Sequence, residues 1–71
     1  MKVALLSFHS FDEVILQLQK AAGYSLEKAA ELTLRVHHNG KAVVFIGSKE
    51  DCEKVAGVLG QIRLVTQVEK T

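Results

Sequence analysis

Alternating apolar positions predict a strand near each end of the chain. Residues 2–8 place Val3 and Leu5 on one face and Ala4, Leu6 and Phe8 on the other. Two apolar faces favour a strand inside a sheet, covered on at least part of both sides. In residues 62–69, mainly apolar positions alternate with mainly polar positions, and this pattern is typical of a strand with one buried face. The two sets are Ile62, Leu64, Thr66 and Val68 against Arg63, Val65, Gln67 and Glu69.

A third strand is predicted at residues 41–47, which are almost continuously apolar around Val43, Val44, Phe45 and Ile46. A continuous apolar run of this length favours a strand that is covered on both faces. The sequence therefore predicts that residues 41–47 lie in the centre of the sheet.

Three segments between the strands carry apolar residues at helical spacing. Each follows a serine, a favoured N-cap residue, and each ends near a glycine. The pairs are Ser10 and Gly23, Ser25 and Gly40, and Ser48 and Gly60. Ser10 and Glu13 also match a capping box, in which each side chain bonds the other residue's amide. The predicted buried stripes are Phe11, Val14, Ile15, Leu18 and Ala22; Leu26, Ala29, Leu32 and Val36; and Cys52, Val55, Ala56 and Leu59.

The order of these elements is β-α-α-β-α-β. It predicts an α+β fold, with a three-stranded antiparallel sheet and three helices packed mainly on one face. Caps, apolar spacing and terminating glycines agree along the sequence, so we expect a single domain over residues 1–71.

The charge balance disfavours nucleic acid as a partner. Nine Lys and Arg stand against eight Asp and Glu, a net charge of +1, and the sequence contains no basic run. Three Phe and one Tyr offer few rings on which bases could stack. The apolar runs are much shorter than the roughly 20 residues that span a bilayer. The single cysteine, Cys52, permits no internal disulfide, so we expect a cytoplasmic protein without a membrane partner.

The sequence offers few groups for catalysis or metal binding. Zinc needs three or four clustered ligands, and the histidines are His9, His37 and His38. His37 and His38 are adjacent, so on a helix they point about 100° apart, and only the fold could bring His9 to them. Cys52 belongs to an apolar stripe, which favours burial over reactivity. We therefore expect no enzyme activity, metal or cofactor.

Residues 34–42 contain the segment Val-His-x-x-Gly-Lys-Ala. Together with residues 14–20 and the sequence Tyr-Ser-Leu-Glu-Lys-Ala at 24–29, this segment resembles the ClpS family of Clp protease adaptors, in a shortened and divergent form. The resemblance implies the same β-α-α-β-α-β fold. It also implies docking on the N-terminal domain of a Clp-type AAA+ unfoldase. The substrates of such adaptors carry a bulky hydrophobic N-terminal residue, known as an N-degron.

The resemblance assigns roles to particular residues. His37 matches a histidine that helps to hold the α-amino group of the substrate. Phe11, Val14 and Thr33 match positions that line the hydrophobic pocket. Two charged residues, Glu50 and Lys54, match positions used against the unfoldase. Core packing is the alternative interpretation of Phe11 and Val14, and a solvated i,i+4 pair is the alternative for Glu50 and Lys54.

The chain departs from the family pattern ahead of the first helix. The family has an Asn-Asp-Asp run there, whereas residues 7–10 read Ser-Phe-His-Ser and contain no carboxylate. Thr33 stands where the family usually has a larger pocket residue. The sequence starts at the first strand, so we expect the flexible N-terminal extension of the family to be missing. Because a buried ammonium group without acceptors costs several kcal/mol, we expect a protein-binding adaptor or modulator with weak N-degron recognition.

Two other functions remain open at the level of sequence. Residues 23–29 and 48–51 are also similar to the helices of the ribosomal stalk C-terminal domain, which binds translation factors through a Lys-rich face. Here the second helix has Lys28 and Arg35, offset by Glu27 and Glu31, and this charge pattern disfavours that function. The second is a small regulatory domain that binds a small molecule or metal, as a monomer or a homodimer.

Overall fold

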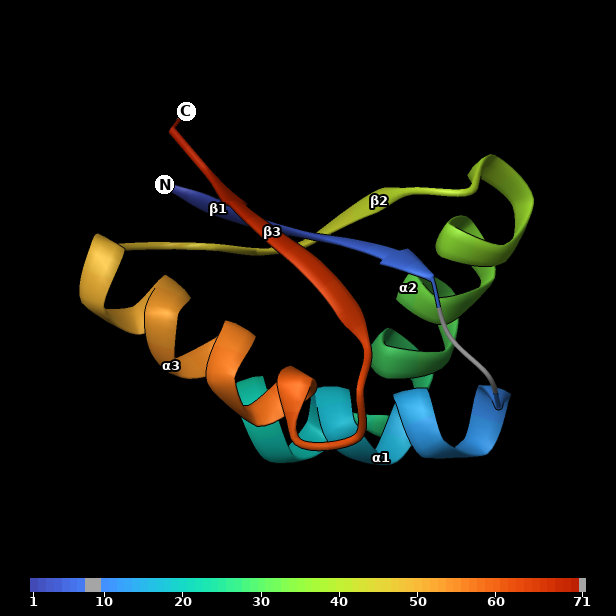
Figure 1. Cartoon of the computed structure of the whole chain (residues 1–71). Coiled ribbons are helices and arrows are strands. Elements are labelled where there is room, and N and C mark those ends of the chain that lie inside the picture. The colour runs from blue at the N-terminus through green and yellow to red at the C-terminus, as the bar shows by residue number, and fades with distance from the viewer. Residues whose placement is uncertain (8–9, 71) are drawn as a thin grey trace.

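The computed structural model describes residues 1–7 and 10–70 and has the predicted α+β architecture. Three helices lie mainly against one face of a three-stranded antiparallel sheet, with α1 and α3 side by side beneath it (Figure 1). The predicted order β-α-α-β-α-β is confirmed. The elements are β1 (Lys2–Ser7), α1 (Phe11–Ala22), α2 (Leu26–Asn39), β2 (Ala42–Ile46), α3 (Lys49–Gly60) and β3 (Val65–Glu69).

The strand order is β2-β1-β3, with β1 antiparallel to both neighbours. The prediction that the first strand lies inside the sheet is confirmed. The prediction that residues 41–47 form the central strand is wrong, because β2 lies at an edge. Its apolarity has another cause: the register with β1 shifts between Phe45 and Val43, so Val44 is an extra, bulged residue. Val44 enters the core, whereas Ile46 remains 70% exposed at the edge.

The core lies between the sheet and the helices and draws on every element except β3, which packs Val68 against it. The predicted stripes supply most of it, but Leu26, in the first turn of α2, is 62% exposed. Gln17 in α1 is also buried, although it does not belong to the predicted apolar stripe. Its amide Nε2 donates to the carbonyl oxygen of Val58 in α3 at 2.6 Å, which satisfies the buried donor. The core residues are Val3, Leu5, Val14, Leu18, Ala29, Leu32, Val36, Val44, Cys52, Val55, Leu59 and Leu64.

Two of the three predicted serine caps form hydrogen bonds. Ser25 Oγ accepts from the amide of Lys28, and Ser48 Oγ accepts from the amide of Asp51, both at 3.1 Å. Ser10 is the N-cap residue of α1, but its side chain makes no cap bond, so the capping-box prediction is wrong. The backbone of Ser10 is more extended, with φ −142°, than the φ of −65° and −66° at Ser25 and Ser48. The serine hydroxyl is therefore presented differently to the first turn.

The helix ends set the directions of the following segments. Gly23 and Gly40 have left-handed φ values of 69° and 77°, as predicted for terminating glycines. Gly60 is the last residue of α3, and its φ is not positive. The left-handed residue between α3 and β3 is instead Arg63, with φ 62°. The turn at residues 61–63 delays β3 to Val65, three residues later than the predicted strand.

None of the described helices is both long enough and apolar enough to cross a bilayer.

Candidate functional site

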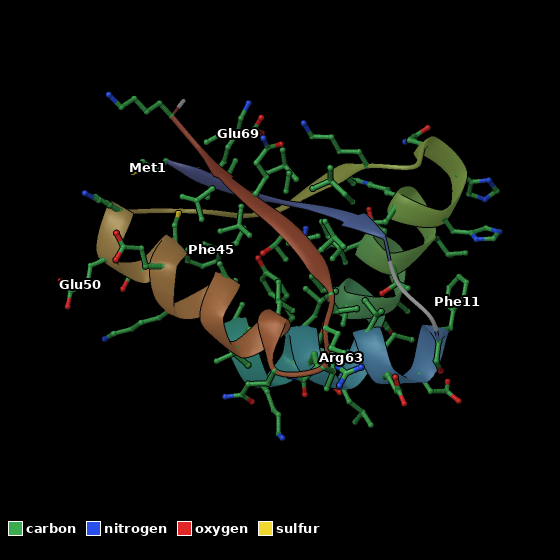
Figure 2. The ribbon with its side chains drawn as sticks, in the orientation of Figure 1. Met1, Phe11, Phe45, Glu50, Arg63 and Glu69 are labelled. Carbon is green, nitrogen blue, oxygen red and sulfur yellow. The ribbon has the colours of Figure 1, made fainter. Side chains whose placement is uncertain are left out.

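The first turn of α1 meets the last turn of α2 at one corner of the helix layer. The rings of Phe11 and His37 lie there with centroids 5.6 Å apart and planes tilted by 58°. Phe11 is half-buried and His37 is exposed, and Figure 2 shows Phe11 at the outer end of α1. The structure therefore brings together two predicted peptide-binding residues that are far apart in the sequence.

The other two predicted pocket residues lie one turn further in. Val14 follows Phe11 by three positions in α1, and Thr33 precedes His37 by four in α2, so each pair shares a helix face. Val14 and Thr33 are both fully buried, and Val14 belongs to the core cluster. The Thr33 hydroxyl donates to the carbonyl oxygen of Ala29 at 2.7 Å. We call Phe11, Val14, Thr33 and His37 the α1–α2 corner.

Asp12 follows Phe11 in the first turn of α1 and is the charged residue next to the α1–α2 corner in that helix. Asp12 is exposed and lines a shallow hollow of about 250 Å³ with Ile15, Leu16 and Leu26. Successive helix residues are about 100° apart, so Asp12 lies on a different face of α1 from Phe11. The prediction about His9 lies outside the residues that the structure describes.

The predicted docking residues Glu50 and Lys54 lie on α3, and Figure 2 shows Glu50 at the opposite end of the molecule from Phe11. Both are exposed. The ion pairs formed within residues 1–7 and 10–70 are Glu31–Arg35 and Lys41–Glu69, so Glu50 and Lys54 do not bond each other there. Both charges of this α3 surface face solvent.

Within the described part of the chain, no group of three or more His, Cys, Asp or Glu side chains could hold a metal ion. The rings of His37 and His38 lie 5.7 Å apart in an edge-to-face arrangement. Cys52 is buried, as predicted, and its thiol lies 3.7 Å from the carbonyl oxygen of Gly47.

A family model described as "ATP-dependent Clp protease adaptor protein ClpS" matches residues 7–68. This stretch contains the α1–α2 corner and the charged residues of α3. The chain belongs to the ClpS family. The match favours the ClpS interpretation over the ribosomal stalk and regulatory-domain alternatives, which it does not support.

ClpS adapter proteins of three organisms are similar to about half of the chain. The Streptomyces coelicolor protein is 50% identical over 36 residues, which are 51% of this chain and 38% of that protein. The Nocardia farcinica protein is 57% identical over 35 residues, 49% of this chain and 33% of that protein. The Mycobacterium leprae protein is 54% identical over 35 residues, which are 49% of this chain and 32% of that protein. The chain therefore spans about a third of the length of these ClpS relatives.

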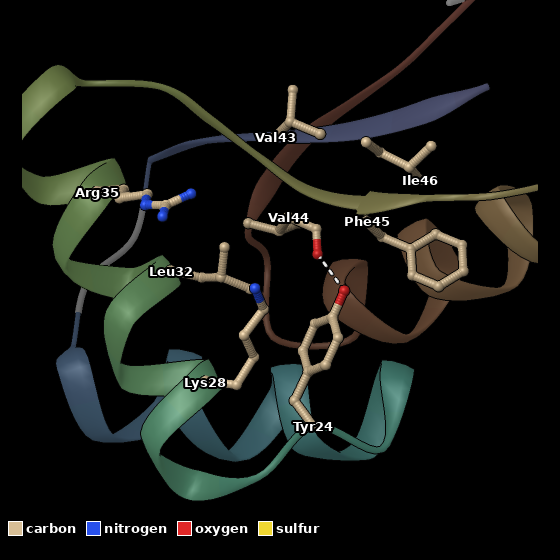
Figure 3. Close-up of a pocket in the computed structure, with 8 residues that line it drawn as sticks. All are labelled: Tyr24, Lys28, Leu32, Arg35, Val43, Val44, Phe45 and Ile46. Atoms are coloured by element: carbon tan, nitrogen blue, oxygen red, sulfur yellow. Dashed lines mark hydrogen bonds between the residues drawn. The ribbon is translucent and has the colours of Figure 1, made fainter.

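This ClpS-family chain has a further surface feature that the sequence did not predict. An open groove of about 400 Å³ runs between α2 and β2, and Figure 3 shows it closed at one end by Tyr24. The Tyr24 hydroxyl donates to the carbonyl oxygen of Val44 at 2.6 Å, and desolvation raises the pKa of Tyr24 above its usual value. The α2–β2 groove is lined by Tyr24, Lys28, Leu32, Arg35, Val43, Val44, Phe45 and Ile46.

Proposed function

We propose that the chain works as a ClpS-type adaptor or modulator that binds other proteins without chemical turnover. In this role the start of α3 docks on the N-terminal domain of a Clp-type AAA+ unfoldase, and the α1–α2 corner contacts a second polypeptide. The observation that carries the proposal is the ClpS family match over residues 7–68, because it includes both surfaces. The two surfaces lie at opposite ends of the molecule, so one partner would leave room for the other.

The α3 surface suits docking through charge. Glu50 lies in the first turn of α3, near the positive end of the helix dipole, and Lys54 lies one turn later. A rigid helix holds these two opposite charges at a fixed separation, which a partner with the reversed order could match. Exposed interface charges of this kind mainly accelerate association and select the partner.

The α1–α2 corner supports only weak capture of an N-degron. Val14 and Thr33 are fully buried, so a bulky side chain could reach them only if the helices moved apart. Among the four residues of the corner, none carries a negative charge to hold an ammonium group. A neutral His37 offers a single acceptor nitrogen. We therefore propose that the corner adds specificity for a partner surface and does not grip a free N-terminus tightly.

Binding to the unfoldase domain is the direct test. The purified chain should bind the isolated N-domain of a Clp unfoldase from the same organism in isothermal titration calorimetry. Glu50→Lys should weaken binding about fivefold or more, because it places a like charge against the partner. Glu27→Lys is a matched control, since Glu27 is the second residue of α2 as Glu50 is of α3. Absence of binding at high micromolar concentration, or equal losses for both variants, would count against the proposal.

Peptide binding is tested separately. Peptides that begin with Phe, Leu, Tyr or Trp should bind weakly, and acetylation of their N-terminus should change the affinity little. Tight binding that acetylation abolishes would show that the chain does recognise free N-termini, and the interpretation of the α1–α2 corner would then be wrong.

A further inference from the structure

The α2–β2 groove combines an apolar floor with a cationic rim. Leu32 and Val44 form the floor and are both almost fully buried. The charged residues that line the groove, Lys28 and Arg35, are both cations, and Figure 3 shows both side chains extending from α2 toward β2. Lys28 forms no ion pair with any residue at positions 1–7 or 10–70, and the pair between Arg35 and Glu31 is exposed and therefore weak.

The strand that forms the other wall has an open edge. The amide of Gly47 donates to the carbonyl oxygen of Met1 at 2.9 Å. The N-terminal amino group of Met1 donates to the carbonyl oxygen of Gly47 at 2.8 Å. Antiparallel pairs alternate along a ladder, so the next bonded pair is Val3 with Phe45. The backbone N–H and C=O of Ile46 consequently point away from β1. Among residues 1–7 and 10–70, no strand lies beyond β2, so these groups offer one donor and one acceptor to another strand.

The neighbouring carbonyl is already occupied. The carbonyl oxygen of Val44, at the bulge, accepts the Tyr24 hydroxyl. An added strand would therefore pair at Ile46 and not continue past the bulge. The contact would be short, and its affinity would depend on the side chains that meet the rim and the floor.

The rim disfavours a second copy of the chain in this groove. Pairing two β2 edges would bring two sets of Lys28 and Arg35 together, and like charges across an interface oppose association. Carboxylates are the matching groups. An apolar side chain matches the floor, and an extended backbone matches the Ile46 edge.

We propose that the α2–β2 groove binds an extended acidic peptide segment of a partner protein. The segment adds beside Ile46, places an apolar side chain over Leu32 and Val44, and directs carboxylates to Lys28 and Arg35. This binding is independent of the α1–α2 corner and needs no free N-terminus. A peptide with both ends blocked therefore tests it without an unfoldase, so its failure is distinguishable from failure of the proposed adaptor role.

Nuclear magnetic resonance titration of the whole ¹⁵N-labelled chain is the experiment. The probe is Glu-Thr-Val-Thr-Glu with an acetylated N-terminus and an amidated C-terminus, and the comparison peptide is Lys-Thr-Val-Thr-Lys with the same ends. The first, third and fifth side chains of an extended strand share one face, so the Val and both Glu can enter the same groove. The acidic peptide should shift the amide signals of Ile46 and its β2 neighbours and the Arg35 side chain. Raising the salt concentration from about 0.05 M to about 0.5 M should weaken binding of the acidic peptide several-fold, because salt screens exposed charges.

Variants separate the charge from the backbone contribution. Lys28→Gln and Arg35→Gln should each weaken binding of the acidic peptide about 1.5- to 5-fold. Lys20 is an exposed cation on α1, and Lys20→Gln should leave this affinity unchanged. Ile46→Pro removes an N–H that points away from β1, at a position where edge strands accept proline, and Ile46→Thr controls for loss of the Ile side chain. Ile46→Pro should abolish the β2 shifts while Ile46→Thr keeps them, with folding checked by circular dichroism.

Three results would overturn the proposal. The first is equal binding of the acidic and basic peptides. The second is a set of shifts at Phe11 and His37 instead of β2. The third is an absence of shifts at millimolar peptide.

Discussion

Tyr24 links the turn between α1 and α2 to the bulge of β2, and Tyr24→Phe tests how much that link stabilises the fold. The hydroxyl donates to the Val44 carbonyl oxygen at 2.6 Å, and Tyr24 as a residue is half-buried. Removing one hydrogen bond of this kind costs about 0.5–1.5 kcal/mol. The ring remains, so packing changes little. For a domain of this size, a loss of 1 kcal/mol lowers the melting temperature by about 4–8 °C.

The same substitution should change how stability depends on pH. Burial raises the pKa of Tyr24 above its usual value of 10.0, so the unfolded chain loses this proton at a lower pH than the folded chain. The stabilisation is therefore complete below pH 10.0 and is lost as the pH rises through the folded pKa. Lysines titrate in the same range, so the useful quantity is the difference between wild type and Tyr24→Phe. This difference should shrink at alkaline pH.

Urea denaturation of both proteins at neutral and alkaline pH measures these effects. The chain has one Tyr and no Trp, so tyrosinate absorbance reports the titration of Tyr24 alone. An unchanged urea slope would show that the substitution alters stability and not the extent of unfolding. The reasoning is refuted if Tyr24→Phe is as stable as wild type at neutral pH, or if the tyrosine titrates at or below its usual pKa.

Four further substitutions test the helix caps, the turn at residues 61–63 and the core by thermal or urea unfolding. Ser48→Ala should cost about 1 kcal/mol because it removes the bond to the Asp51 amide, whereas Ser10→Ala should cost clearly less, and equal losses would contradict the cap assignment. Arg63→Gly should stabilise the fold by roughly 0.5–1 kcal/mol, since the left-handed strain of Arg63 exceeds the extra chain entropy of glycine; a loss would show that the arginine side chain contributes more than its backbone costs. Leu18→Ala should cost about 2–5 kcal/mol because Leu18 is fully buried, and a loss below 1 kcal/mol would mean that the core is looser than described.

The sequence predicted the order of elements well because the residues that begin and end the helices act locally. Ser25 and Ser48 carry side-chain caps, and Gly23 and Gly40 end their helices in the left-handed conformation, as expected from residue type alone. Burial within the sheet was less predictable. A continuous apolar run is the same in sequence whether a strand is central or bulged at an edge, and only the register shift at Val44 distinguishes the two.

Polar side chains with hidden partners account for other differences. Gln17 is buried because its amide reaches a carbonyl of α3, a contact that no local pattern reveals. At the α1–α2 corner, the family resemblance and not the spacing suggested that Phe11 and His37 act together, since they lie on different helices. The α2–β2 groove was missed because its lining comes from a turn, a helix and a strand. A lone tyrosine between two helices was the one available signal, since its hydroxyl needs a partner when buried.

The residues proposed for binding differ in how clearly mutation can test them. Glu50, Lys54 and Lys28 are exposed. Substitution of Lys54 or Lys28 should change stability by less than about 0.5 kcal/mol, and loss of Glu50 from the first turn of α3 should cost about 0.3–1 kcal/mol. A binding defect at these positions would therefore report on the interface itself. Val14 and Thr33 are fully buried, so their substitution would disturb the core as well as any pocket. In a chain of 71 residues with so small a core, such variants would confuse unfolding with loss of binding, and the exposed residues must decide between the proposed surfaces.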